Sequence, residues 1–222
     1  MEGNRFNPFL LGLMIVFSCA YARADVIADG SAPPSQQPDI TSASNGVPLV
    51  NIQTPSKAGV SRNHYQQFDV ERQGVILNNA QTNVTTQLGG WVQGNPNLSG
   101  GTARVILNEI NANDPSRLNG YVEVGGDRAQ VVIANPAGIT RDGCGFINAN
   151  RASLTTGQLR VEDGQWQGYD VQTGTLRIEG QGLDSRTAQY TDLISQAVEV
   201  NAGVWAETLN VVAGQGVVSA DT

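Results

Sequence analysis

The stretch ARVILNEINANDPSRLNGYVEVGGDRAQVVIANPAGI, residues 103–139, decides the fold class of this chain. Its apolar runs are short and rich in Val and Ile, and they end in Asn or Gly, as in VILN, VEVGG and VVIAN. β-Branched residues favour strands, whereas Asn and Gly favour the turns between strands. Because no helical period of 3.6 residues extends over a useful length, the stretch predicts short strands joined by tight turns.

Similar runs lie on both sides of this stretch. They recur roughly every 10 to 25 residues, a spacing typical of stacked repeats. The runs of the whole chain are VPLVNI (47–52), HYQQFDV (64–70), GVILNNA (74–80), ARVILNEI (103–110), YVEV (121–124), AQVVIAN (129–135), GFINAN (145–150), QLRVEDG (158–164), TLRIEG (175–180), AVEVNAG (197–203) and TLNVVAG (208–214).

Two all-β architectures fit this pattern: a β-sandwich and a right-handed parallel β-helix. Sandwich strands usually bring larger aromatic residues into the core, yet only 6% of this chain is aromatic. Small aliphatic ladders with Asn and Gly at the corners suit stacked coils better. We therefore favour the β-helix, with roughly eight to ten coils at the usual strand spacing, and keep the sandwich as the alternative.

The N-terminus predicts export. Residues 8–20, PFLLGLMIVFSCA, have the length of a secretory apolar region, and the small-x-small triplet 22–24 follows them. We expect a signal peptide at 1–24, cleaved between Ala24 and Asp25. Cleavage removes Cys19 and leaves Cys144 as the only cysteine, so no internal disulfide can form.

The exported part divides by composition. Residues 25–46 are rich in Pro, Ser, Asp and Gln, which predicts an extended N-terminal segment or cap. Residues 47–222 form the predicted β-helix domain. Because TLNVVAGQGVVSADT stops in the middle of the strand pattern, we expect the chain to be a fragment of a longer repeat protein.

Charge and side-chain chemistry exclude several functions. The net charge is −7 and no Lys/Arg cluster occurs, so we expect no nucleic-acid partner. One histidine, His64, and one exported cysteine cannot build a metal site of nitrogen and sulfur ligands, and no cofactor motif is present. Cys144 lacks a nearby base, and we expect it to be a buried packing residue rather than a nucleophile.

Acidic and basic residues at the predicted turns keep one enzymatic function open as an alternative. Many parallel β-helices act on polysaccharides through acidic and basic side chains gathered on one face. The candidates form no repeated pattern, so exposed turn residues are the favoured interpretation and a polysaccharide-acting enzyme stays the alternative. These candidates are Arg141, Asp142, Arg160, Glu162 and Asp163.

Two Asn-Pro turns are the most informative motifs. The first is Asn95, Pro96, Asn97 and Leu98, and the second is Asn135, Pro136, Ala137, Gly138 and Ile139. Pro presets φ at the second position of a turn, the preceding Asn caps the turn through its side chain, and Gly supplies a positive φ.

With these turns the chain resembles the N-terminal two-partner secretion domain of large bacterial exoproteins, such as filamentous haemagglutinins, haemolysins and contact-dependent growth inhibition toxins. The resemblance rests on NPNL (95–98), NPAGI (135–139), VILNEINANDPSRLNGYVEV (105–124) and GCGFINANRASLTTG (143–157). It is clear over residues 45 to 160. Many members have Asn where Ala137 stands, and some carry a C-x-x-C pair whose first Cys corresponds to Arg141, so that disulfide is absent here.

The resemblance implies a right-handed parallel β-helix with an N-terminal cap and extra-helical hairpins. It also implies a non-catalytic secretion module that the POTRA domains of a cognate outer-membrane β-barrel transporter recognise. Export through the Sec machinery and the periplasm, folding at the cell surface and a monomeric state are further expectations, with both Asn-Pro turns as secretion determinants. At the first turn we expect the Asn97 side chain to face solvent and to be the group that the transporter recognises directly. A module that binds glycans or host proteins directly, as an adhesin, stays a third alternative.

Overall fold

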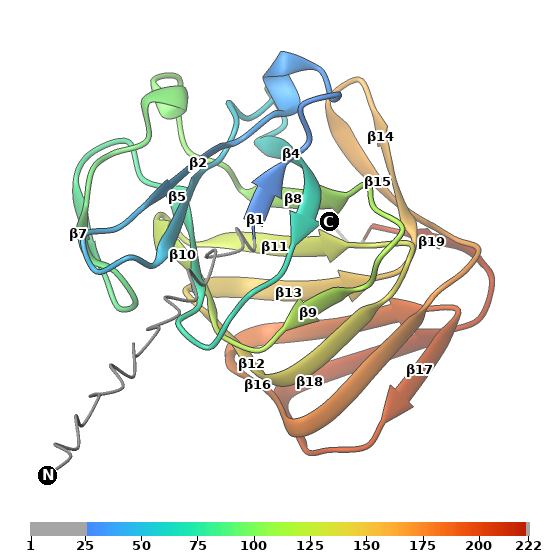
Figure 1. The fold of residues 1–222 in the computed structure, drawn as a ribbon. Coiled ribbons are helices and arrows are strands. Elements are labelled where there is room, and N and C mark those ends of the chain that lie inside the picture. The colour runs from blue at the N-terminus through green and yellow to red at the C-terminus, as the bar shows by residue number, and fades with distance from the viewer. Residues whose placement is uncertain (1–25, 221–222) are drawn as a thin grey trace, which may run out of the picture.

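The computed structural model describes residues 26–220, so the predicted signal peptide and its junction at Ala24 and Asp25 lie outside the described residues. Nearly every described element is a strand, and the only helices in this part are two short 3-10 turns. The long strands run parallel and stack into coils, which confirms the predicted parallel β-helix (Figure 1). No described helix is long and apolar enough to cross a membrane.

Three strand faces surround the core of the β-helix. The first face stacks β4 (Val60–Phe68), β8 (Val105–Ile110), β11 (Ala129–Ala134), β13 (Ala149–Thr155), the last part of β16 (Thr175–Ser195) and β18 (Val204–Ala213). The second face stacks β3 (Pro48–Asn51), β5 (Val75–Asn79), β10 (Val122–Gly126), the last part of β12 (Ile139–Ile147), the middle of β16 and the start of β18. The third face stacks β9 (Ser116–Leu118), the starts of β12 and β16, and β17 (Ala197–Val200).

Ladders of small aliphatic side chains fill the interior. On the second face Val50, Leu77 and Val124 lie in one register row and all belong to the buried core. A pair of Asn side chains also joins the first two coils, because Asn78 donates to the side chain of Asn51 on the neighbouring strand. Each coil therefore buries the apolar face of the coil before it, which is how a solenoid gains stability.

The described stack is shorter than the sequence led us to expect. The first and second faces each hold six levels between residues 26 and 220, not eight to ten. The reason is that several strands lie outside the coils. They form an N-terminal cap and two extra-helical hairpins, as the family resemblance implied.

The cap covers the first coil with antiparallel strands. β1 (Val26–Ala28) pairs with β4, and β2 (Asp39–Ser42) pairs with β3, while the 3-10 turn η1 (Pro34–Gln36) lies between them. Unpaired strand edges invite association with other strands, and the cap covers those of β4 and β3. The predicted boundary at residue 46 falls in the turn between β2 and β3.

The extra-helical hairpins project from the stack on separate sides (Figure 1). The first pairs β6 (Val84–Thr86) with β7 (Gly90–Val92) and is followed by the second 3-10 turn, η2 (Pro96–Leu98). The second pairs β14 (Gln158–Glu162) with β15 (Gln165–Val171), and β19 (Gly216–Ser219) adds to it as a third strand.

Candidate functional site

The first Asn-Pro turn is fixed by the side chain of Asn95. Its Oδ1 accepts a hydrogen bond from the backbone N of Asn97 at 2.9 Å, which caps η2. Its Nδ2 donates to the carbonyls of Ile52 and Asn78, both at 2.9 Å. Asn95 is only 2% exposed and Leu98 is fully buried in the core. The turn is thus bonded into the structure rather than offered to solvent.

Asn97 occupies a different position from the one expected. The sequence led us to expect a side chain facing solvent and free for recognition. Instead, Asn97 is half-buried, and its Nδ2 donates to Asp39 Oδ2 at 3.0 Å and to the Ile52 carbonyl at 3.3 Å. The physical reason is the cap, since β2 folds back beside the turn and presents Asp39 to it.

The second Asn-Pro turn repeats the same side-chain arrangement. The Oδ1 of Asn135 accepts from the backbone N of Ala137 at 3.0 Å, and its Nδ2 donates to the Asp114 carbonyl and to Ser116 Oγ, both at 3.0 Å. The backbone N of Gly138 donates to the Asn135 carbonyl at 3.0 Å and closes the turn. Asn135 is fully buried, so these bonds satisfy polar groups of its side chain that water cannot reach.

The departure at Ala137 leaves this turn intact. Ala137 contributes its backbone N–H to the cap, which any residue except Pro can do. Gly138 has φ +126, a conformation that favours Gly, and Ile139 is fully buried. The capping bond therefore does not need an Asn at position 137.

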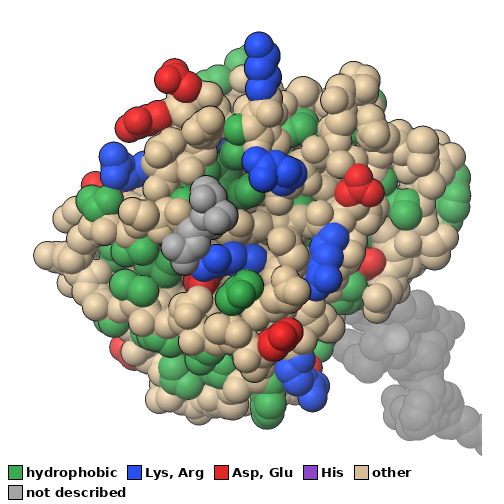
Figure 2. Space-filling model, turned by 180° about the vertical axis from the view of Figure 1, so that it is seen from behind, with side chains coloured by type: hydrophobic (Ala, Val, Ile, Leu, Met, Phe, Trp, Pro, Cys, Tyr) green, Lys and Arg blue, Asp and Glu red, His purple; other side chains and the backbone are tan. Residues whose placement is uncertain are grey.

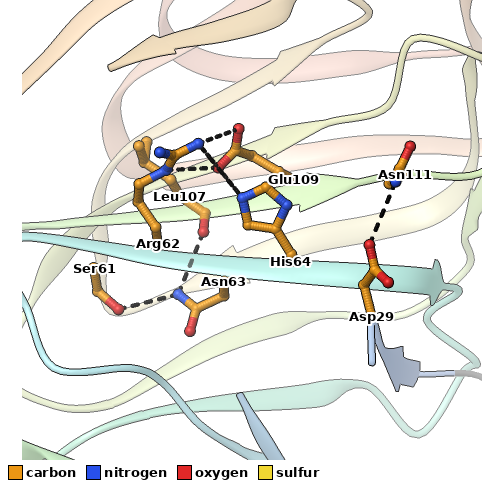
Figure 3. A network of polar contacts seen from close by, with 8 residues as sticks. All are labelled: Asp29, Ser61, Arg62, Asn63, His64, Leu107, Glu109 and Asn111. Carbon is orange, nitrogen blue, oxygen red and sulfur yellow. Dashed lines mark hydrogen bonds and ion pairs between the residues drawn. The ribbon is translucent and has the colours of Figure 1, made fainter. Parts of the chain in front are cut away.

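His64 belongs to a polar network on the outside of the first two coils (Figure 3). Its Nε2 lies 2.9 Å from Glu109 Oε2, and Arg62 pairs with the same carboxylate at 2.9 Å. Nearby, Asn111 donates to Asp29, and the hydrogen bond from the Ser31 hydroxyl lowers the pKa of Asp29 below its usual range. Arg62, His64 and Glu109 join β4 to β8, and the backbone N–H of Asp29, just after β1, donates to the His64 carbonyl at 3.0 Å. These contacts tie the cap to the stack.

Cys144 and Arg141 lie together inside the β-helix. Cys144 is buried, as expected, and the guanidinium of Arg141 donates to its sulfur. The expectation that Arg141 is an exposed turn residue is wrong. Arg141 is 0% exposed because it shares an inward register row with Leu118 and Ile178. Its Nε and Nη1 have no hydrogen-bond partner among residues 26–220.

The other charged candidates do not converge on one face. Asp142 lies on β12 and accepts from the backbone N of Gln181. Arg160 and Glu162 form a 3.8 Å pair on the β14–β15 hairpin, followed by Asp163 at its turn. Figure 2 shows acidic and basic side chains interspersed on one side of the molecule. Among the described residues no three His, Cys, Asp or Glu side chains could hold a metal ion.

Comparison with known proteins gives the family. The profile of the TPS secretion domain matches residues 24–222. The chain is 58% identical to a protein named Toxin CdiA from Yersinia pestis, over 98% of this chain and 7% of that protein. It is 47% identical to tRNA nuclease CdiA-2 from Burkholderia pseudomallei (strain 1026b), over 91% of this chain and 6% of that protein.

A solved structure shows the same fold. The crystal structure of the filamentous hemagglutinin secretion domain superposes with a TM-score of 0.78 at 36% identity. The match covers 88% of this chain and 65% of that one. The chain thus spans less than a tenth of the length of these curated relatives and most of a solved secretion domain. It belongs to the family of TPS secretion domains, which serve two-partner secretion.

Proposed function

We propose that this chain targets a larger exoprotein to a cognate outer-membrane β-barrel transporter, whose POTRA domains recognise it in the periplasm. In this proposal the Sec machinery exports the chain and residues 1–24 are removed. The monomeric domain then crosses the outer membrane unfolded and nucleates β-helix folding at the cell surface. It has no catalytic role of its own. Family membership and the arrangement of the two Asn-Pro turns support this proposal.

The observation that carries the proposed function is that the side chains of both turns bond to residues earlier in the chain. The side-chain amide of Asn95 donates to residues 43 and 17 positions earlier in the chain. That of Asn135 donates to residues 21 and 19 positions earlier. The side-chain amide of each Asn therefore bonds to chain that has already emerged, while the backbone N–H of Asn135 pairs with the later Thr155 carbonyl.

This direction suits folding that proceeds from the N-terminus. A chain that emerges N-terminus first can complete the first turn before the second has appeared. Each locked turn presents a finished strand edge on which the next coil can pair, as expected for solenoids that grow by adding neighbours. Such stepwise folding outside the membrane would oppose backward movement of the chain.

The activity of the whole protein lies beyond this domain. Two of the relatives described above are named as a toxin and a tRNA nuclease. We infer that the complete protein is an exoprotein of this kind, either an inhibition toxin or an adhesin of the haemagglutinin type. Its receptor and effector chemistry would reside outside residues 1–222.

Export from cells that carry the cognate transporter tests the proposal. Asn135→Ala should lower the amount of chain outside the cell, because the second turn can no longer lock onto Asp114 and Ser116. Asn113→Ala is the matched control, since Asn113 is exposed and lies beside the same turn. Wild-type export of Asn135→Ala, or equal loss in both variants, would contradict the proposed role of the turn.

A further inference from the structure

We propose that the groove beside the first hairpin binds a neutral saccharide. This groove has a volume of about 370 Å³, within the usual range for small-ligand sites. One wall is the end of β2 and the turn after it, and the other runs from β7 to the first Asn-Pro turn. The second wall carries one exposed aromatic side chain, Trp91.

The polar side-chain groups of the groove are uncharged, and all but the side-chain carbonyl oxygen of Asn51, which accepts from Asn78, are available. Thr41, Ser42, Ser44, Asn51 and Gln93 line it, and no Asp, Glu, Lys or Arg is among its described lining residues. Within residues 26–220 the three hydroxyls and the Gln93 side-chain amide have no protein hydrogen-bond partner. Hydroxyls and amides both donate and accept, which matches the hydroxyl groups of a sugar. A site without charge, in a chain of net charge −7, favours a neutral ligand over an ionic one.

Trp91 supplies the apolar part of the site. Its side chain is 57% exposed, although burial of an aromatic ring is strongly favourable. A sugar ring has one face made of C–H groups, and that face can cover an indole while the ring hydroxyls reach the polar wall. The indole N–H adds a donor at the same place.

The site is held in shape before any ligand arrives. Ala43, Leu49 and Val92 line the groove and are buried in a small apolar cluster with Val47 and Ile76. The Asn45 side chain also donates to the Leu88 carbonyl at 2.8 Å and ties the turn after β2 to the hairpin. A preformed site loses little conformational entropy on binding.

Two other occupants are less well matched to this groove. An added strand, from another protein or a second copy, would use the backbone edge of β2 and leave the polar side chains of the opposite wall unused. A saccharide uses both walls and the ring of Trp91. These other occupants are separate outcomes of the test below.

An array of neutral and acidic oligosaccharides, followed by calorimetry of the strongest neutral binder, tests the proposal on the purified chain. Trp91→Ala should weaken that binding by about tenfold or more, since it removes the stacking surface. Trp205→Ala is the matched control because Trp205 is 48% exposed on β18, outside the groove. Binding of no neutral glycan, preference for acidic glycans, or equal losses in both variants would overturn the proposal.

Two further measurements separate this site from the export function. Trp91→Ala should leave the chain as abundant outside the cell as the wild type. Loss of export in that variant would assign the groove to the transporter and overturn the saccharide proposal, while the proposed secretion function would stand. If sedimentation velocity shows that the wild-type chain is a dimer and that Trp91→Ala dissociates it, the groove would be a self-association surface. That result would also overturn the saccharide proposal.

Discussion

The two Asn-Pro turns use one side-chain arrangement in two different surroundings. In each, the Asn Oδ1 accepts from the backbone N two residues later and the Nδ2 donates to two earlier acceptors. The first turn lies against the N-terminal cap, where Asn97 bonds to Asp39 of β2. The second lies within the stack, between the loop at 114–116 and the strand that begins at Thr175.

This difference teaches that the motif itself does not determine how much a turn matters for stability. The second turn lies between two segments of the stack, and loss of Asn135 there would leave the hydroxyl of the buried Ser116 and the N–H of Ala137 without their side-chain partner. The first turn has a partly redundant contact, because the Ile52 carbonyl accepts from both Asn95 and Asn97. We therefore expect substitutions in the second turn to cost more.

Asn135→Ala should give the largest effect. It removes three hydrogen bonds of a fully buried side chain and leaves the N–H of the half-buried Ala137 and the hydroxyl of the buried Ser116 without their partner. We expect a loss of about 3 kcal/mol in the free energy of unfolding, since each unsatisfied buried group costs about 1–3 kcal/mol. Urea unfolding, with Asn113→Ala as control, measures it. A loss no larger than that of Asn95→Ala would break the comparison.

Asn95→Ala should cost less, about 2 kcal/mol. It removes the cap of η2 and the bond to Asn78, but the Ile52 carbonyl keeps its contact with Asn97. The double variant with Asn97→Ala sharpens this point by urea unfolding. Its loss should exceed the sum of the two single losses, because only then is the Ile52 carbonyl left without a side-chain donor. Strict additivity would show that the shared acceptor does not matter.

Gly138→Ala tests the backbone rather than the side chains. Gly138 has φ +126, and an added Cβ would lie 3.1 Å from the Thr175 carbonyl oxygen. We expect a loss of about 1–2 kcal/mol from backbone strain. Gly100→Ala, just after the first turn, is the matched control, because nothing lies within 4 Å of its added Cβ. Thermal unfolding of both variants suffices, and equal melting temperatures would contradict the tight stacking of the second turn.

Much of the fold could be predicted because its strands contain apolar runs. Each of the predicted runs falls in or overlaps a strand of the structure. The long strand β16 was found only at its start. Its later part, from Gln181 to Tyr190, is rich in polar and charged residues and becomes a strand because it pairs with β12 and β18. Such pairing is non-local and leaves no local sequence signal.

The side-chain caps of the two turns could be predicted from the sequence. The contacts of these turns with residues far away in the sequence could not. Turn chemistry is local, so an Asn before Pro indicates a side-chain cap from sequence alone. The contact of Asn97 with Asp39 joins residues 58 positions apart, and nothing in either local sequence indicates it. Arg141 was misplaced for the same reason. Its burial follows from the register of β12, which sets it two positions after the inward-facing Ile139.

Asn97→Ala should have the smallest effect on stability and still lower export. Its side chain is half-buried and its partner Asp39 is exposed, so we expect a loss of roughly 0.5 kcal/mol in the free energy of unfolding. If the Asn97 amide itself is recognised in transport, export should fall far more than this loss explains. Asp39→Ala breaks the same hydrogen bond while keeping the amide, so it should be exported normally.

Equal export defects in the two variants would mean that docking of the cap onto the turn, not the amide, is what transport requires. Wild-type export of both would remove Asn97 from the secretion determinants. In that case the first turn would act only through Asn95, as a buried cap like that of Asn135.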